Sequence, residues 1–126
     1  MVTEYHTEFL TATILGWHHL LKDNSYKDVI IKSFEWLVNK NKCAINAFVI
    51  MPNHFHLIWK RSNGFERKNV QGSLFSFTAH EFKKKINNDP SLLENYYVNN
   101  ADREFQFWER EPRLKNAGQK NSFSKN

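Results

Sequence analysis

The first clear pattern of hydrophobic and polar positions lies in residues 7–15, where the side chains alternate between two faces. Leu10, Ala12 and Ile14 form one of these faces, and Gly16 follows the segment at once. A period of two residues is that of a β-strand, and glycine commonly ends one. The alternation therefore predicts a strand over residues 7–15.

Two later segments repeat their apolar residues with helical spacing. The first is predicted to begin at Ser25, which can cap a helix, and to end within residues 39–42. The second is predicted over residues 70–88, and it ends before Asp89-Pro90. Pro90 can open a further short helix that reaches Tyr96.

Between the two helices lies a continuous apolar run, residues 44–51, which is typical of a strand buried on both faces. Pro52-Asn53 interrupts the run, because proline cannot donate to a sheet ladder. Residues 54–60 resume as a second strand, so we expect a hairpin. Residues 105–108 alternate and predict a fourth strand.

The order strand, helix, strand, strand, helix, strand predicts an α+β fold. We expect a ferredoxin-like sandwich, in which an antiparallel sheet carries its helices on one face. One domain is expected over residues 1–111, followed by a polar, poorly ordered tail over residues 112–126. Because this architecture hosts many unrelated functions, function must be argued from individual residues.

The amino-acid composition excludes some kinds of metal site and cross-link, and it favours one kind of partner. The chain has 126 residues and one cysteine, Cys43, so an intramolecular disulfide and a thiolate zinc cluster are excluded. Its apolar runs are too short to span a membrane, and we expect a soluble, cytoplasmic protein with no membrane partner. The net charge of +5 favours a polyanionic partner.

Seven basic residues are candidates for a phosphate-binding surface. A lysine run near a helix end is also ordinary solvation and compensation of the helix dipole, so both interpretations stay open. The candidate DNA-binding residues are Lys60, Arg61, Arg67, Lys68, Lys83, Lys84 and Lys85.

His54 and His56 are the residues that suggest chemistry. They lie two positions apart on a predicted strand, so both side chains point to one face of the sheet and Phe55 points to the other. Two adjacent imidazoles can chelate one divalent cation. The alternative is a pair of exposed or hydrogen-bonded histidines without a metal.

Residues 47–58, AFVIMPNHFHLI, resemble the histidine–hydrophobe–histidine (HUH) strand of IS200-like transposases. They are more similar still to the REP-associated tyrosine transposases. The resemblance extends to residues 5–17, 75–79 and 105–108, and it covers about the first 111 residues.

This resemblance implies DNA transposition chemistry on single-stranded or hairpin DNA. A tyrosine hydroxyl would attack the scissile phosphate and form a 5′-phosphotyrosine link, as in a single-strand DNA endonuclease. His54 and His56 would hold a divalent metal, Mg or Mn, that polarises the phosphate. Such proteins can act as homodimers in which one protomer supplies the tyrosine to the other.

The sequence departs from that family at the nucleophile. The family's tyrosine lies on a helix that follows the aromatic strand, but no tyrosine occurs after Tyr97. Tyr96 lies three residues before Asn99, a spacing similar to that of the family's tyrosine motif. Tyr96 precedes the aromatic strand, however, and packing within a helix is its favoured role. We therefore expect strand cleavage to be lost by truncation, or to need a second protomer. The alternative is a non-catalytic ferredoxin-like module that binds nucleic acid or metal.

Overall fold

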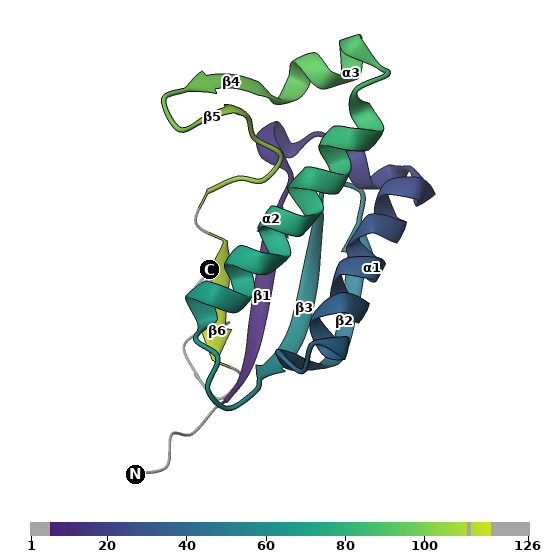
Figure 1. The fold of residues 1–126 in the computed structure, drawn as a ribbon. Coiled ribbons are helices and arrows are strands. Elements are labelled where there is room, and N and C mark those ends of the chain that lie inside the picture. Colours follow the sequence, from purple (N-terminus) through teal and green to yellow (C-terminus); the bar gives the residue numbers. More distant parts are fainter. Residues whose placement is uncertain (1–5, 111, 117–126) are drawn as a thin grey trace, which may run out of the picture.

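The structure is a computed structural model, and it describes residues 6–110 and 112–116 (Figure 1). A four-stranded antiparallel sheet has the order β2-β3-β1-β6. Its strands are β1 (Thr7–Thr13), β2 (Cys43–Met51), β3 (His54–Arg61) and β6 (Arg113–Asn116). This order places the last strand beside the first, which confirms the predicted ferredoxin-like sandwich.

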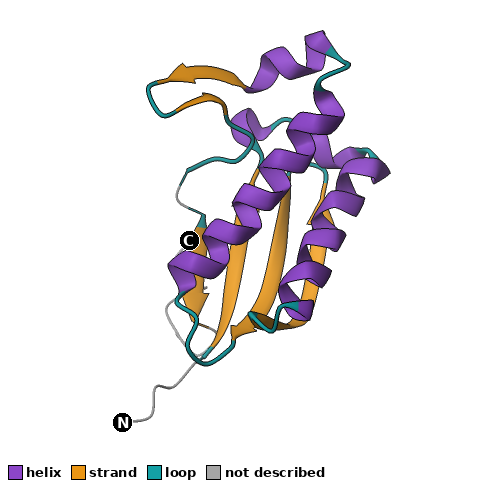
Figure 2. Cartoon of the chain, viewed as in Figure 1, coloured by secondary structure: helices purple, strands orange, loops and turns teal. Residues whose placement is uncertain are grey.

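Two helices, α1 (Asn24–Asn39) and α2 (Arg67–Ile86), lie across one face of the sheet (Figure 2). The other face carries no helix in the described part of the chain. At one end of the sheet lie the short elements η1 (Leu15–Trp17), η2 (Leu20–Lys22), α3 (Pro90–Leu93), η3 (Glu94–Tyr96), β4 (Tyr97–Asn100) and β5 (Arg103–Phe105). No helix of the described residues is long and apolar enough to cross a membrane.

Strand β2 is not buried on both faces, and this part of the sequence prediction was wrong. The strand lies at the edge of the sheet, and Phe48, Val49 and Met51 are all exposed. A run of apolar residues cannot distinguish a central strand from an edge strand, because the distinction depends on partners that are distant in sequence. The helix cap was also wrong, since Asp23, not Ser25, accepts the capping hydrogen bond.

The fourth strand of the main sheet is β6, not residues 105–108. Of those residues only Phe105 is in a strand, because β5 pairs with β4 in a separate ribbon. Trp108 instead makes an isolated bridge with Ile14. Residues 113–116 had been assigned to the polar tail, but their backbone pairs with β1. The rest of that expected tail, residues 117–126, lies outside the described residues.

The core is built on the central strand β3. Phe55, Leu57 and Trp59 alternate along it and are fully buried under the helices. Trp108 packs edge-on against Phe55, with ring centroids 5.4 Å apart, and its indole nitrogen donates to the Thr78 hydroxyl at 2.9 Å. Every second side chain of β3 is thereby fixed on the helix side.

One buried carboxylate anchors the far end of β1. Glu8 is 1% exposed, and Arg61 donates to it from Nε at 3.1 Å and from Nη2 at 3.3 Å. Arg67 approaches the same carboxylate at 3.6 Å from the first turn of α2. Because a buried charge is costly without a partner, Arg61 has a structural role that its exposed neighbour Lys60 lacks.

We predict that Arg61→Ala lowers the free energy of unfolding by about 2–4 kcal/mol, since it strands the buried Glu8 carboxylate. Lys60→Ala is the matched control, and its effect should stay within about 0.5 kcal/mol. Urea denaturation of the three proteins measures both changes. Equal stabilities would show that Arg67 alone satisfies Glu8.

Candidate functional site

His54 and His56 lie side by side on the uncovered face of β3. Their ring centroids are 4.8 Å apart and the ring planes meet at 82°. Phe55, between them, is fully buried on the opposite face, as the sequence spacing predicts. His54 is half-buried and His56 is exposed, so both rings share a surface that solvent reaches.

Each histidine is held through its Nδ1 atom. The His54 Nδ1 atom lies 2.7 Å from the Asn53 side-chain oxygen, which can only accept, so Nδ1 must carry the proton. The His56 Nδ1 atom lies 2.9 Å from the Thr11 hydroxyl on the neighbouring strand. Both partners orient their rings, as the partners of a metal-binding imidazole do. The Thr11 hydroxyl can donate or accept and so does not set the tautomer of His56, whereas the contact with Asn53 leaves the His54 lone pair on Nε2.

The sequence analysis missed both of these partners. Thr11 faces His56 because the antiparallel pairing of β1 and β3 places these two residues opposite each other. They are 45 residues apart in sequence. Asn53 could have been found, because it is adjacent to His54 in the turn and its amide oxygen is a common partner of imidazole.

The electrostatics favour neutral imidazole at His54. Partial burial lowers the pKa of His54, and the neighbouring charge of His56 lowers it further. A neutral ring is the form that binds a metal ion.

The donor set suits a divalent ion, but it is incomplete. Within residues 6–110 and 112–116, no group of three or more His, Cys, Asp or Glu side chains could hold a metal. Two imidazoles would leave the other coordination positions to water or to oxygens of a ligand. That arrangement fits Mn²⁺, and it fits Mg²⁺ once those oxygen ligands are supplied.

The basic candidates are divided between the two layers. Lys60 is exposed on the histidine face, opposite Thr7 of β1. Arg113, which the sequence analysis did not select, is exposed and lies opposite Thr11, on the other side of Thr11 from His56. Lys68 is exposed on the first turns of α2.

The remaining candidates lie away from the histidines. Arg61 and Arg67 contact Glu8, as described above. The lysine run is in the last turn of α2, on the helix layer, where Lys83 lies over the Phe105 ring and Lys85 over the Tyr26 ring. Lys84 pairs with Glu81 at 3.3 Å. The structure therefore does not gather all seven basic residues around the metal site.

Tyr96 is poorly suited to be a nucleophile. It is fully buried and its ring stacks on Phe107, 4.9 Å away between centroids. Burial, with a smaller effect of Tyr26, raises the pKa of Tyr96 to about 12. An activated tyrosine needs the reverse shift and access to substrate. Helix-side packing is the role that the structure supports.

An exposed aromatic residue lies at the same end of the sheet as His54. Trp17 is 64% exposed and has a φ of 61°, a left-handed conformation that is rare for a bulky residue. The loop is fixed by the Gly16 amide, which donates to Glu109 Oε2 at 2.7 Å, and by the Ile14 amide, which donates to the Asn53 carbonyl. Strained residues of this kind often accompany ligand-binding sites.

Comparisons with known proteins bear on the fold. No protein-family profile matches the sequence, and neither does any curated protein. Among solved structures, the chain is similar to a REP-associated tyrosine transposase bound to a REP hairpin, with a TM-score of 0.63 and 14% identity. That match covers 98% of this chain but 65% of the other, so the chain spans less than two thirds of that transposase.

A second similar structure is that of a candidate transposase from Deinococcus radiodurans R1. Its TM-score is 0.64 at 14% identity, and the match covers 94% of this chain and 83% of the other. At this identity the likeness is one of fold. The comparisons thus show that the chain has the α+β fold of REP-associated and IS200-like transposases.

Proposed function

We propose that this protein binds single-stranded or hairpin DNA on the uncovered face of its sheet, with His54 and His56 holding Mg²⁺ or Mn²⁺ at that face. The observation that carries the proposal is the pair of adjacent imidazoles whose Nδ1 atoms are both engaged by the protein. With both Nδ1 atoms engaged, the two Nε2 atoms would be left to bind one ion.

The ion would supply electrostatic stabilisation of a phosphate group. When bound, it would polarise the phosphate oxygens and offset the negative charge that develops during displacement at phosphorus. Thr11 and Asn53 orient the two rings, and Asn53 keeps the Nδ1 proton of His54 in place. The neutral form of His54, which its lowered pKa favours, is available to bind near neutral pH.

Charge and aromatic surface support DNA as the partner. The chain carries a net charge of +5, and Lys60 and Arg113 lie on the face that carries the histidines. Exposed Trp17 could stack on an unpaired base. A transposase of the same fold has been solved bound to a REP hairpin, which makes a DNA hairpin the natural ligand to test.

Cleavage would need a tyrosine that reaches the metal site. In that reaction the phenol loses its proton as its oxygen bonds to phosphorus, and the bond from phosphorus to the 3′-oxygen breaks. The 3′-oxygen takes up a proton and becomes a free 3′-hydroxyl. Tyr26 and Tyr96 are buried on the helix side, and Tyr97 lies on the β4–β5 ribbon. We therefore propose DNA binding as the activity of this domain, with transesterification only where a tyrosine from outside the described residues, such as one of another protomer, supplies the nucleophile.

For the metal site, we expect His54→Ala and His56→Ala each to abolish saturable Mn²⁺ binding in calorimetry, because one imidazole alone holds the ion weakly. Asn53→Ala and Thr11→Val should weaken binding by about 10- to 100-fold, since they release a ligand's orientation. His80→Ala, an exposed histidine on α2, is the control. Mn²⁺ affinity that survives both histidine replacements would reject the site.

A second test concerns the proton affinity of His54. NMR titration should give its imidazole a pKa below the ordinary value of about 6.5, and His56→Ala should move that pKa upward. Because protons compete with the ion for Nε2, Mn²⁺ affinity should fall as the pH drops below 6.5. A His54 pKa above that value, or no response to His56→Ala, would contradict the inferred coupling.

The third test concerns DNA. Trp17→Ala should weaken binding of a fluorescent single-stranded oligonucleotide by about tenfold, which is the usual worth of one stacked base. Anisotropy titrations at fixed salt measure the affinity, and Trp36→Phe serves as an aromatic control on α1. Equal affinities for wild type and Trp17→Ala would remove Trp17 from the DNA surface.

A further inference from the structure

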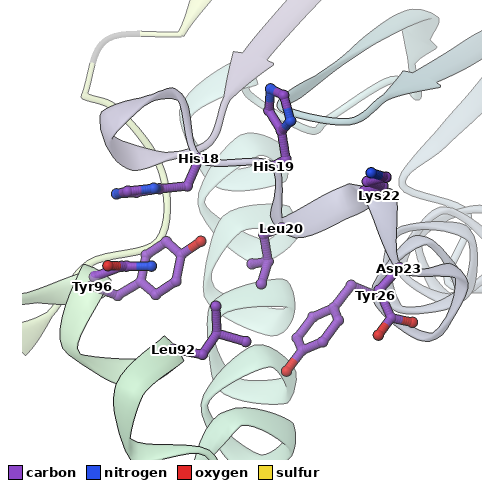
Figure 3. Close-up of a pocket in the computed structure, with 9 residues that line it drawn as sticks. His18, His19, Leu20, Lys22, Asp23, Tyr26, Leu92 and Tyr96 are labelled. Atoms are coloured by element: carbon purple, nitrogen blue, oxygen red, sulfur yellow. The ribbon is translucent and has the colours of Figure 1, made fainter.

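A cavity of about 460 Å³ is lined by residues of η2, α1, α3 and η3, near the end of the sheet where β1 ends. Figure 3 shows Leu20 and Leu92 pointing into the space between the rings of Tyr26 and Tyr96. These four side chains give the cavity apolar walls, while its rim is polar.

The rim of the cavity carries hydrogen-bond donors. His18, His19 and Lys22 line it and are all exposed. The single acidic side chain among the lining residues, Asp23, caps α1 by accepting from the Ser25 amide at 2.8 Å. The mouth therefore offers one ammonium group and two imidazoles that can donate to a phosphate.

The Tyr96 hydroxyl is buried here without a hydrogen-bond partner among the described residues. Figure 3 shows it directed into the cavity, between His18 and Leu20. Burying an unpaired hydroxyl is unfavourable, so a native structure that does so invites a partner from outside the chain. Its pKa, raised to about 12, keeps the hydroxyl protonated and able to donate.

We propose that this cavity binds one unpaired nucleobase, with the Tyr96 hydroxyl donating to an acceptor on the base edge and Lys22 with the rim imidazoles contacting its phosphate. Apolar walls that include two tyrosine rings suit a heterocycle, whereas a phosphate group alone would gain nothing from them. The proposal rests on the DNA-binding function proposed above, which it deepens by adding a site for one base.

The position of the cavity fits a DNA strand that also reaches the histidines. The lining residues His18, His19 and Leu20 directly follow Trp17 in sequence. The Leu21 amide donates to the Pro52 carbonyl at 2.9 Å, so the loop is bonded to the turn that precedes His54. A strand that crosses the histidine face can therefore place one base at this end of the sheet.

Entry requires one side chain to move, because the Tyr96 hydroxyl is enclosed in the structure. His18 lies edge-on against the Tyr96 ring, with centroids 5.8 Å apart, and it is exposed. Rotation of His18 would open the path without disturbing the stacking of Tyr96 on Phe107.

The test compares Tyr96→Phe with Tyr97→Phe, a matched control whose half-exposed ring lies on β4 outside the cavity. NMR titration with the four deoxynucleoside monophosphates should give saturable shifts at the cavity residues of the wild-type protein. Tyr96→Phe should weaken that binding about tenfold, as expected for loss of one hydrogen bond to a buried group. Its thermal midpoint should not fall, because the ring and its packing remain.

Two further probes separate the possible failures. If inorganic phosphate produces the same shifts as the nucleotides and Tyr96→Phe changes nothing, the rim is a simple anion site and the proposal is overturned. If the wild-type chain binds monophosphates but no oligonucleotide, the DNA-binding function fails while the base site stands, with free nucleotides as its source. If oligonucleotide binding is strong and no monophosphate binds, the base site is wrong and DNA binding stands.

Discussion

The alternation of side chains along β3 is the constraint on which the candidate site depends. Phe55, Leu57 and Trp59 are fully buried on the helix side, so the residues between them must face the other way. A shift of one residue in pairing would bury both imidazoles and expose the aromatic core. The hydrophobic energy of the core therefore fixes the direction of His54 and His56, and no contact to a metal is needed to do so.

A shared direction alone does not make two histidines a metal site, because each ring must also be held in a fixed orientation. Here the neighbouring elements provide that orientation. Thr11 comes from β1 and Asn53 from the hairpin turn, and each engages one Nδ1 atom. Pairs of exposed histidines without such partners would rotate freely and expose either nitrogen. The sheet and its hairpin turn therefore provide the common face and the ring orientations, and Asn53 also sets the tautomer of His54; this is the preorganisation that a metal site requires.

Local patterns were sufficient for the parts of the fold that follow from local physics. The strand period around His54, the turn at Pro52 and both helices could be predicted from spacing and from proline chemistry. The exposure of β2, the Thr11 partner of His56 and the pairing of β6 with β1 could not. Each of these depends on which distant strand lies alongside, and β6 pairs through its backbone, which leaves no hydrophobic period to detect.

The same dependence on distant partners limits what a count of basic residues can predict about the proposed DNA surface. Arg61 is basic in sequence, but it pairs with the buried Glu8 carboxylate. The lysine run at the end of α2 lies over aromatic rings or beside Glu81. Arg113, in a segment with no distinguishing pattern, stands beside the histidine row. Electrostatic attraction to DNA depends on unmatched charge at the binding face, so three-dimensional placement outweighs the net charge of +5. The proposed phosphate binding and the supply of a nucleophile would thus be separable, because the sheet that orients the imidazoles contains no tyrosine among the described residues.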